Sequence, residues 1–321
     1  MNTMVTTLSP RLVTLMNLLR VFVVLALLVL SRVAVADDTR IALLSSEDAA
    51  PYKEVLKGFQ QSLSKQGINA TFDEYPLQGS SDKASQAVQE AKQKGTTLIV
   101  TIGTLATQTA IKEAGDIPIV AALVPNPDDL KTGNATGVGL DFSPETQFQW
   151  LQRLLPDAKT VGVVFNPKKS ARRIEAATQA ARSLGLTLVT KQAETPQALT
   201  EALKSLANDT KVLWAITDST LFSPQTAETV LLFSFRNRIP VAGLSTSWVK
   251  AGALYALDRD YLDLGAQCGE MAGKIIQGTK ANSLPPTTPR KVVYALNLKT
   301  ATHLKLDIAQ PLIDGAQQVF K

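Results

Sequence analysis

The 321-residue sequence has one cysteine, Cys268, and one histidine, His303, and aromatic residues make up only 6% of it. A single cysteine cannot form an intrachain disulfide, and its distance from the amino terminus excludes a lipid anchor on an N-terminal cysteine. Cys268 lies in the amphipathic pattern LGAQCGEMAGKII, where a buried structural thiol is expected. His303 lies in a pattern typical of a terminal helix, where a structural position is expected.

The sequence also lacks the motifs of the common catalytic sites. It contains no G-x-S-x-G elbow, no Walker A sequence, no G-x-G-x-x-G fingerprint and no cluster of residues with metal-ligand spacing. The stretch GVG at 137–139 has no further glycine at the spacing of a dinucleotide site. Because no acid and base are paired near a nucleophile, we expect a protein that is not an enzyme and that holds no cofactor and no metal.

Basic and acidic residues are nearly balanced, and no run of like charges reaches five residues. The first 36 residues carry Arg11, Arg20 and Arg32 and no acidic residue, so without them the formal net charge falls from +5 to +2. This balance excludes the strongly basic face of a nucleic-acid-binding protein. No apolar run after the leader is long enough to cross a membrane.

Residues 1–36 have the three parts of a secretory signal peptide. A basic start is followed by the apolar run VFVVLALLVL at 21–30 and by AVA at 34–36. We expect cleavage after Ala36 and export to the periplasm of a Gram-negative cell. The alternative is an uncleaved anchor, but the ten-residue run is shorter than the ~20 residues that span a bilayer.

After the leader, short β-rich runs alternate with helical runs in two successive series. The first series contains the β-rich runs RIALLS, INATFDEY, TTLIVTIG and IPIVAAL, and the second contains TVGVVFNP, LTLVTKQ, KVLWAITD and IPVAGLS. Strands that alternate with crossover helices predict parallel sheets covered on both faces. We therefore expect an α/β fold with two Rossmann-like lobes, in which the two IP-containing runs take corresponding places.

The segment after residue 260 breaks this order, because a further helix arrives once the second series is complete. We expect this helix to return to the first lobe, so that several strands crossing between the lobes form a hinge. The expected N-terminal lobe is 37–141 plus 261–291, and the expected C-terminal lobe is 142–260 plus 292–321. Asp258 or Asp260 could tune this hinge.

Several stretches resemble bacterial ABC-transporter substrate-binding proteins of the tryptophan/tyrosine-binding type, which have the type I periplasmic binding protein fold. The resemblance begins with TLIVTIGT, IPIV and GNATGVGLDFSPETQFQWLQRLLPDAKTVGVVFNP. It continues in the same order through IPVAGLSTSWVKAGALYALDRDYLDLGAQCGEMAGKIIQG and VVYALNLKTATHLKLDI. It implies two hinged lobes that clamp an amino acid or a similar small solute. The stretch VPNPDD departs from the Asp-Pro-Val-like turn common in the family, and solute specificity does not transfer with the fold.

In such a fold, ligands bind beyond the carboxyl ends of the strands. In the first lobe, Gly103 would let a ligand approach the backbone, and Thr104 could offer its hydroxyl at a helix start that favours a carboxylate. The alternative is that Thr104 only caps its own helix. The other candidates in this lobe are two hydroxyls after the first strand, an aromatic ring that could stack or simply be half-buried, and an amide: Ser45, Ser46, Tyr52 and Asn126.

In the second lobe, Asp218 follows the apolar run VLWAI and could bind the ammonium group of an amino acid. The alternative, a helix-capping role, is weaker because Ser223 already suits it. Trp248 is an aromatic candidate with a packing role as its alternative. The remaining candidates, all from loops after strands, are Asn166, Ser219 and Ser245.

These observations predict a soluble, monomeric periplasmic protein that binds a small carboxylate-bearing solute, an amino acid, and delivers it to an ABC permease. The alternative is a ligand-sensing partner of a membrane receptor or histidine kinase, because the same fold serves both roles.

Overall fold

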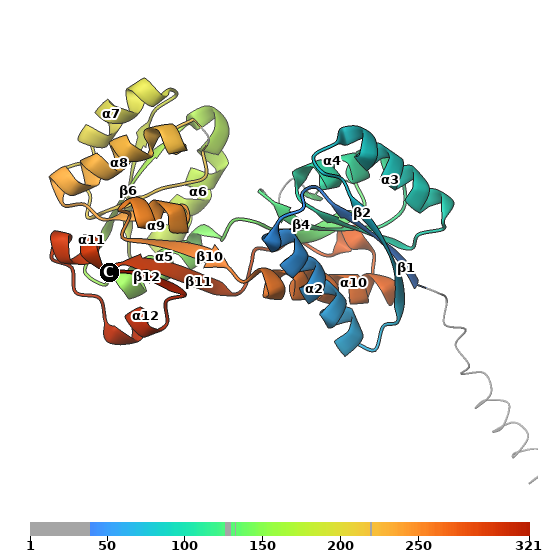
Figure 1. Cartoon of the computed structure of the whole chain (residues 1–321). Coiled ribbons are helices and arrows are strands. Elements are labelled where there is room, and N and C mark those ends of the chain that lie inside the picture. Colours follow the sequence, from blue (N-terminus) through green and yellow to red (C-terminus); the bar gives the residue numbers. More distant parts are fainter. Residues whose placement is uncertain (1–38, 126–129, 132, 219) are drawn as a thin grey trace, which may run out of the picture.

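The structure is a computed structural model that describes residues 39–125, 130–131, 133–218 and 220–321. The predicted leader and the candidate residues Asn126 and Ser219 lie outside these ranges. Within them, no helix combines the length and the apolar character that crossing a membrane requires. The described chain forms two α/β lobes that are joined by extended segments (Figure 1).

The first lobe is built on a parallel sheet with the strand order β2-β1-β3-β4-β5. Alternate residues of β1 face opposite layers, since Ile41 and Leu43 pack with α2 and α10, whereas Ala42 and Leu44 pack with α3 and α4. This burial on both faces is why the strands are continuous apolar runs. The elements are β1 (Thr39–Ser45), α2 (Ala50–Lys65), β2 (Ala70–Pro76), α3 (Ser81–Gln93), β3 (Leu98–Ile102), α4 (Thr104–Glu113), β4 (Ile119–Val124), β5 (Ala135–Gly139) and α10 (Tyr261–Ile276).

The second lobe has the order β12-β11-β10-β9-β8-β6-β7, and all neighbours are parallel except β10 and β11. Its strands are β6 (Thr160–Phe165), β7 (Thr187–Gln192), β8 (Val212–Trp214), β9 (Val241–Gly243), β10 (Tyr255–Arg259), β11 (Val292–Asn297) and β12 (Gln318–Phe320). Its helices are α5 (Pro144–Leu154), α6 (Pro167–Ser183), α7 (Pro196–Lys204), α8 (Pro224–Asn237), α9 (Thr246–Ala251), α11 (Leu298–Leu304) and α12 (Gln310–Asp314).

The two sheets share one topology, because the order of β7-β6-β8-β9-β10 repeats that of β2-β1-β3-β4-β5. The two IP-containing runs form β4 and β9, the fourth strand of each lobe, as the sequence predicts. Helix α5 begins with a side-chain cap, since the Ser143 hydroxyl accepts a hydrogen bond from the Thr146 N–H at 3.2 Å. The α/β fold with two Rossmann-like lobes is therefore confirmed.

Three elements differ from the expected pattern. The glycine-containing stretch at 135–139 forms β5, although its two glycines weaken a β signal. Helix α6 begins at Pro167, so that Lys168 and Lys169 lie on a helix and not in a loop. The loop expected to hold Ser245 and Trp248 is short, because the helix α9 already begins at Thr246.

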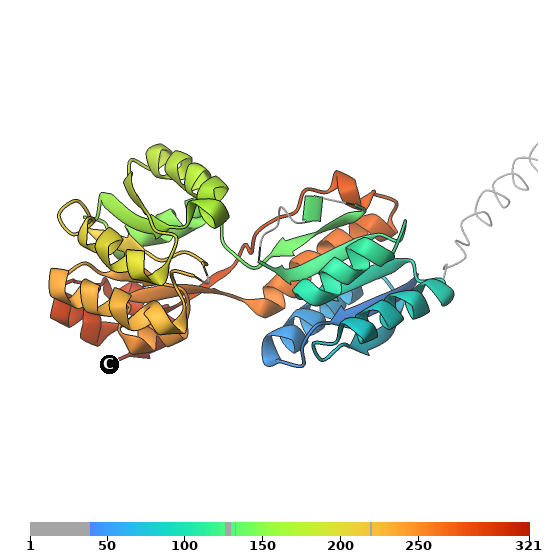
Figure 2. The ribbon, with the colours of Figure 1, turned by 90° about the horizontal axis from the view of Figure 1, so that it is seen from above.

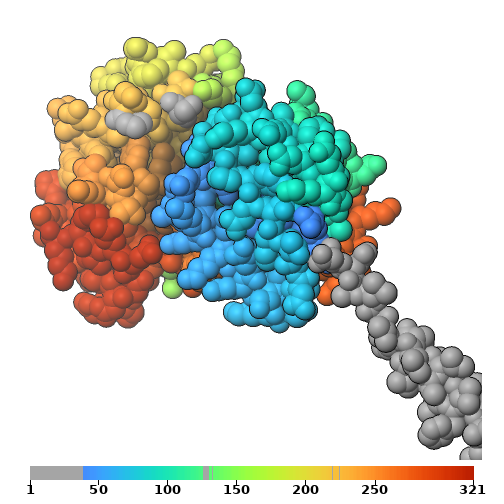
Figure 3. Space-filling model, turned by 45° about the vertical axis from the view of Figure 1, so that its right-hand side comes forward, coloured from blue at the N-terminus to red at the C-terminus, as the bar shows by residue number. Residues whose placement is uncertain are grey.

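The described chain passes between the lobes three times: between β5 and α5, between β10 and α10, and before β11 (Figure 2). Helix α10 packs on α2, β4 and β5, so it returns to the first lobe as expected. In the space-filling view the first lobe, in blue and teal, lies in front of part of the second, in yellow, orange and red (Figure 3). We propose that each lobe moves as one rigid unit and that the two units have the boundaries expected from the sequence, 37–141 plus 261–291 and 142–260 plus 292–321.

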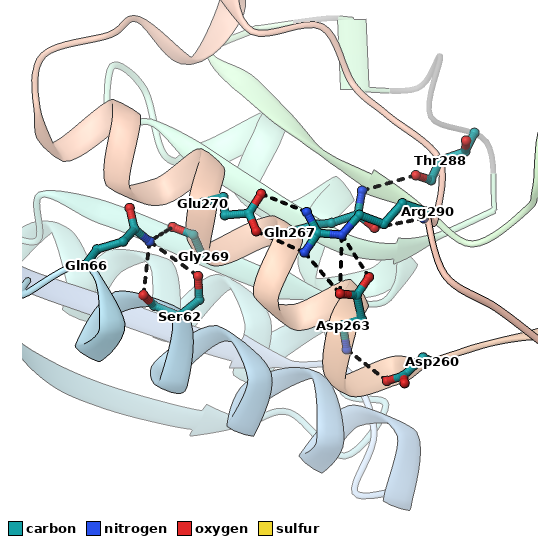
Figure 4. Close-up of polar contacts among 9 residues, drawn as sticks. All are labelled: Ser62, Gln66, Asp260, Asp263, Gln267, Gly269, Glu270, Thr288 and Arg290. Carbon is teal, nitrogen blue, oxygen red and sulfur yellow. Dashed lines mark hydrogen bonds and ion pairs between the residues drawn. The ribbon is translucent and has the colours of Figure 1, made fainter.

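The third crossing is fastened to α10 by polar contacts around Arg290 (Figure 4). The guanidinium donates hydrogen bonds of 2.9–3.2 Å to the carboxylates of Asp263 and Glu270. Gln267 accepts from the Arg290 N–H at 3.0 Å and donates to the Thr288 carbonyl at 3.3 Å. Because Asp263, Gln267 and Glu270 all belong to α10, the strap at 288–290 is held on the first lobe immediately before the chain crosses to the second.

Candidate functional site

The start of α4 is capped from another element. Gly103 has a φ of 91°, and a Cβ at this position would lie 2.8 Å from both the Ser46 hydroxyl and the Tyr52 hydroxyl. The Ser46 Oγ accepts a hydrogen bond from the Ala106 N–H at 3.0 Å, and the Ser46 side chain is buried. Thr104, the first residue of α4, is exposed. The capping oxygen is therefore that of Ser46, which leaves the Thr104 hydroxyl in solvent.

The structure brings Ser46, Tyr52 and Gly103 together at the edge between β1 and β3. These two strands are neighbours at which the strand order reverses, which is where open α/β sheets bind ligands. Burial and then the Glu47 charge raise the pKa of Tyr52, so its hydroxyl stays protonated and can donate a hydrogen bond. Ser45, at the end of β1, has a buried Oγ with no partner among the described residues.

In the second lobe, Asp218 follows β8 and is 4% exposed. Its Oδ1 accepts hydrogen bonds from the N–H groups of Thr220 and Leu221 at 2.8 and 3.1 Å. Its Oδ2 is buried and has no partner within the described part of the chain. Half of the carboxylate therefore stabilises its own turn, and Ser223 separately caps α8 with a capping box. The other half has an unused acceptor.

The other second-lobe candidates have mainly local roles in this structure. The Asn166 side chain is buried and accepts a hydrogen bond from the Lys168 N–H at 3.0 Å, so it caps α6. Ser245 precedes α9 but makes no capping hydrogen bond through its side chain. Trp248 is buried in the core of the second lobe, with its ring 6.3 Å from that of Phe222. This placement corresponds to the packing role of Trp248.

A cavity of about 620 Å³ lies at the base of the space between the lobes. Pro125 and Thr288 border it from the first lobe and the strap, and Asp141 borders it from the first crossing. Thr217 and the start of α6 border it from the second lobe. These residues follow β6 and β8, the neighbouring strands at which the order of the second sheet reverses. Sequence reasoning indicated these two loops, but it missed Asp141.

Asp141 is held on the second lobe by two groups. It forms an ion pair with Arg173 of α6, and its Oδ1 accepts a hydrogen bond from the Thr217 hydroxyl at 3.3 Å. The Arg173 guanidinium lies 5.8 Å from the Trp214 ring, and that ring is fixed because its Nε1 donates to Gln147 at 2.7 Å. The first crossing is therefore tied by charge to the wall of the cavity.

Arg259, at the end of β10, approaches the same region from the second crossing. Its guanidinium lies 5.6 Å from the Phe142 ring and its Nη1 lies 3.7 Å from Asp258. The Nε atoms of Arg173 and Arg259 are both buried and find no hydrogen-bond partner among the described residues. A small cavity of about 40 Å³ is bordered by Asp141 and by both arginines.

The lone cysteine and histidine lie away from these cavities. Cys268 is fully buried in α10, and burial raises the pKa of its thiol to about 12. His303 lies in α11 as expected, and its ring packs edge-on against Phe235 at 5.2 Å. The described residues contain no group of three or more His, Cys, Asp or Glu that could hold a metal ion.

Two matching α/β lobes with a cavity between them define a two-lobed solute-binding protein. The sequence model of the family "ABC transporter substrate binding protein" matches residues 41–320. The chain belongs to this family, and the resemblance to its tryptophan/tyrosine-binding type is confirmed.

Individual relatives agree with this assignment. A tyrosine-binding protein of Clostridioides difficile is 26% identical over 264 residues, which cover 78% of this chain and 76% of the relative. A ligand-free, open substrate-binding protein with adhesive properties from Clostridium difficile is 23% identical, with a TM-score of 0.69 over 88% of this chain and 99% of that one. A Streptococcus pneumoniae ABC domain in complex with L-Trp is also 23% identical, with a TM-score of 0.56 over 88% of this chain and 100% of that one. These structures share the fold.

Proposed function

We propose that this protein is a periplasmic binding protein that captures an amino acid between its lobes and delivers it to an ABC importer. The family match favours transport over the sensing alternative. The relatives whose names include tyrosine and L-Trp support an amino acid as the solute. The observation that carries the proposal is the cavity of about 620 Å³ bordered by both lobes, a volume within the usual range of small-molecule sites.

The two lobes would hold opposite ends of the solute. In the first lobe, the N–H groups at the start of α4 and the Tyr52 hydroxyl can donate to a carboxylate. In the second lobe, the unused Oδ2 of Asp218 can accept from an ammonium group. A solute that bridges these groups contacts both lobes only when they are closed, so it shifts the population toward the closed form. The three crossings act as the hinge for this movement.

We also propose that residues 1–36 direct export and are removed after Ala36. A cleaved leader would leave a soluble protein that begins at Asp37, two residues before β1. Mass spectrometry of the protein from a periplasmic extract tests this proposal. The expected mass begins at Asp37, and a mass that includes residues 1–36 would overturn it.

Isothermal titration of the mature protein against each of the twenty amino acids tests the proposed capture. The protein should first be unfolded and refolded to release any retained solute. We expect at least one amino acid to bind with a stoichiometry of one, and Asp218→Asn to weaken that binding by about tenfold or more, as loss of a charged hydrogen-bond partner predicts. Asp314→Asn, on the exposed helix α12, is the matched control and should bind normally. Absence of binding at millimolar concentration would refute the proposal.

A further inference from the structure

The side of the cavity formed by α6 is strongly basic. Lys168, Lys169, Arg172 and Arg173 all border the cavity from the first two turns of this helix. We call these four residues the basic wall. Asp141 is the one acidic residue among the described residues that border the same cavity.

The charges of the basic wall are only partly balanced. Arg173 pairs with Asp141, and the Lys168 Nζ lies 2.6 Å from a Glu194 carboxylate oxygen. The Lys169 Nζ donates to the Thr220 hydroxyl, which is a neutral partner. Arg172 has no ionic or hydrogen-bond partner among the described residues. Two cations at the cavity therefore have no carboxylate of the described chain to neutralise them.

Two half-buried arginines lie nearby: Arg173 borders the cavity, and Arg259 borders the small cavity of about 40 Å³ beside it. Arg173 and Arg259 each use a ring face and a carboxylate on one side, but their Nε–H donors are left unpaired. An arginine held against an aromatic ring has a fixed orientation, and its free donors suit a carboxylate or phosphate oxygen. Buried donors without partners are costly, so an incoming anion would gain from satisfying them.

The described part of the cavity offers little to an aromatic solute. Phe142 is the one aromatic residue among the described residues that border it, and its ring is buried with Arg259 on its face. Trp214 and Trp248 are likewise buried in the core of the second lobe. An aromatic side chain of the solute would therefore meet mainly lysine and arginine side chains. An acidic group binds these cations more strongly than an aromatic ring does.

We propose that the solute carries a second acidic group, and that the basic wall binds the side-chain carboxylate of a dicarboxylic amino acid. This inference rests on the proposed capture of an amino acid and specifies its class. Gly103, Thr104 and Asp218 do not border this cavity in the present structure, so the proposal requires that lobe closure bring the start of α4 and Asp218 to the α-carboxylate and the ammonium group while the second carboxylate reaches α6. The preferred solute of this chain then differs from the tyrosine and L-Trp named for its relatives.

Titration of the full mature protein with matched solutes tests the proposal. Glutamate and aspartate should bind at least about tenfold more tightly than glutamine and asparagine, because only the acids carry the second charge. Their affinity should fall as sodium chloride rises, since salt screens partly exposed charges. O-phosphoserine is a separate arm, which distinguishes a preference for phosphate from one for carboxylate.

The double variant Lys169→Gln with Arg172→Gln should lower the affinity for glutamate by about tenfold more than it lowers the affinity for glutamine. Both residues lie on the surface of α6, so the variant keeps the core intact. Arg182→Gln, an exposed residue in the last turn of the same helix, is the matched control and should leave both affinities unchanged.

The outcomes separate this inference from the function on which it rests. Tighter binding of tyrosine or tryptophan than of glutamate, or equal binding of glutamate and glutamine, overturns the second acidic group while amino-acid capture stands. Binding of succinate without binding of any amino acid supports the acidic site but refutes the amino acid. Absence of binding by every solute overturns both.

Discussion

Three glycines on the face of α10 that packs on α2 give a graded test of how closely these helices approach. A Cβ at Gly265 would lie 2.0 Å from the Val55 carbonyl oxygen and 2.9 Å from the Phe59 nitrogen, both of which are backbone atoms. A Cβ at Gly273 would lie 2.0 Å from the side-chain oxygen of Gln66. The Gly265→Ala and Gly273→Ala variants therefore add the same methyl group against a rigid neighbour and a flexible one.

The expected costs differ because only the first contact forces the helices apart. Gly265→Ala requires a shift of about an ångström, and overpacking of this kind costs about 1–3 kcal/mol. The better helix propensity of alanine returns about 0.5–1 kcal/mol, so the middle of the two ranges leaves a net loss of about 1 kcal/mol and the upper limit is about 2.5 kcal/mol. At Gly273 the Gln66 side chain can turn away, although it gives up hydrogen bonds to Ser62 and to the Gly269 carbonyl (Figure 4). This loss and the helix-propensity gain nearly cancel, so we expect a change within about 0.5 kcal/mol.

Urea unfolding of the solute-free mature protein, followed by circular dichroism, measures both variants. We expect the wild type and Gly273→Ala to have similar free energies of unfolding, and Gly265→Ala to have a clearly lower one. Gly269→Ala should fall between the two variants, since its Cβ would lie 2.5 Å from the Ser62 Cβ and 2.9 Å from the Phe59 carbonyl oxygen. If Gly265→Ala matches the wild type, or Gly273→Ala is the less stable of the two, the close packing of α2 and α10 is refuted.

Three further predictions concern single side chains. Ser46→Ala removes the cap of α4 and should lower the free energy of unfolding by about 0.5–2 kcal/mol in the same assay; an unchanged value would contradict the capping role. Because burial raises the pKa of Cys268 to about 12, the folded protein should not react with a thiol reagent at pH 8 and should react fully in denaturant; rapid labelling of the folded protein would contradict its burial. Arg290→Gln should cost less than about 1 kcal/mol, because its ion pairs are partly exposed, and the cost should shrink in 1 M salt; a large loss that does not depend on salt would contradict this account.

The architecture was predictable from the sequence where the pattern is local. The alternation of β-rich runs and helical runs indicated both lobes. Strand β5 was missed because Gly137 weakens the β signal, yet glycine is needed there. A Cβ at Gly137 would lie 2.0 Å from the Ala121 carbonyl oxygen of the neighbouring strand. The neighbouring strand therefore requires glycine at position 137, and this requirement is not visible in a single sequence.

The candidate site was predictable by position but not by contact. The rule that ligands bind beyond the strand ends indicated the loops that hold Ser46, Gly103 and Asp218. It could not show that Ser46 caps a helix that begins 58 positions later along the chain, at Thr104, because that contact exists only in the folded lobe. Asp141 and Arg259 were missed for a related reason, since they are far apart in the sequence and border the same small cavity only in the folded chain.

The most direct test of the account is a crystal structure of the protein purified from the periplasm without refolding, so that its natural solute is retained. We expect one amino acid in closed lobes, with its α-carboxylate at Gly103 and Thr104 and its ammonium group within hydrogen-bond distance of the Asp218 Oδ2. A retained solute bound elsewhere, or one that lacks a carboxylate, would contradict the account.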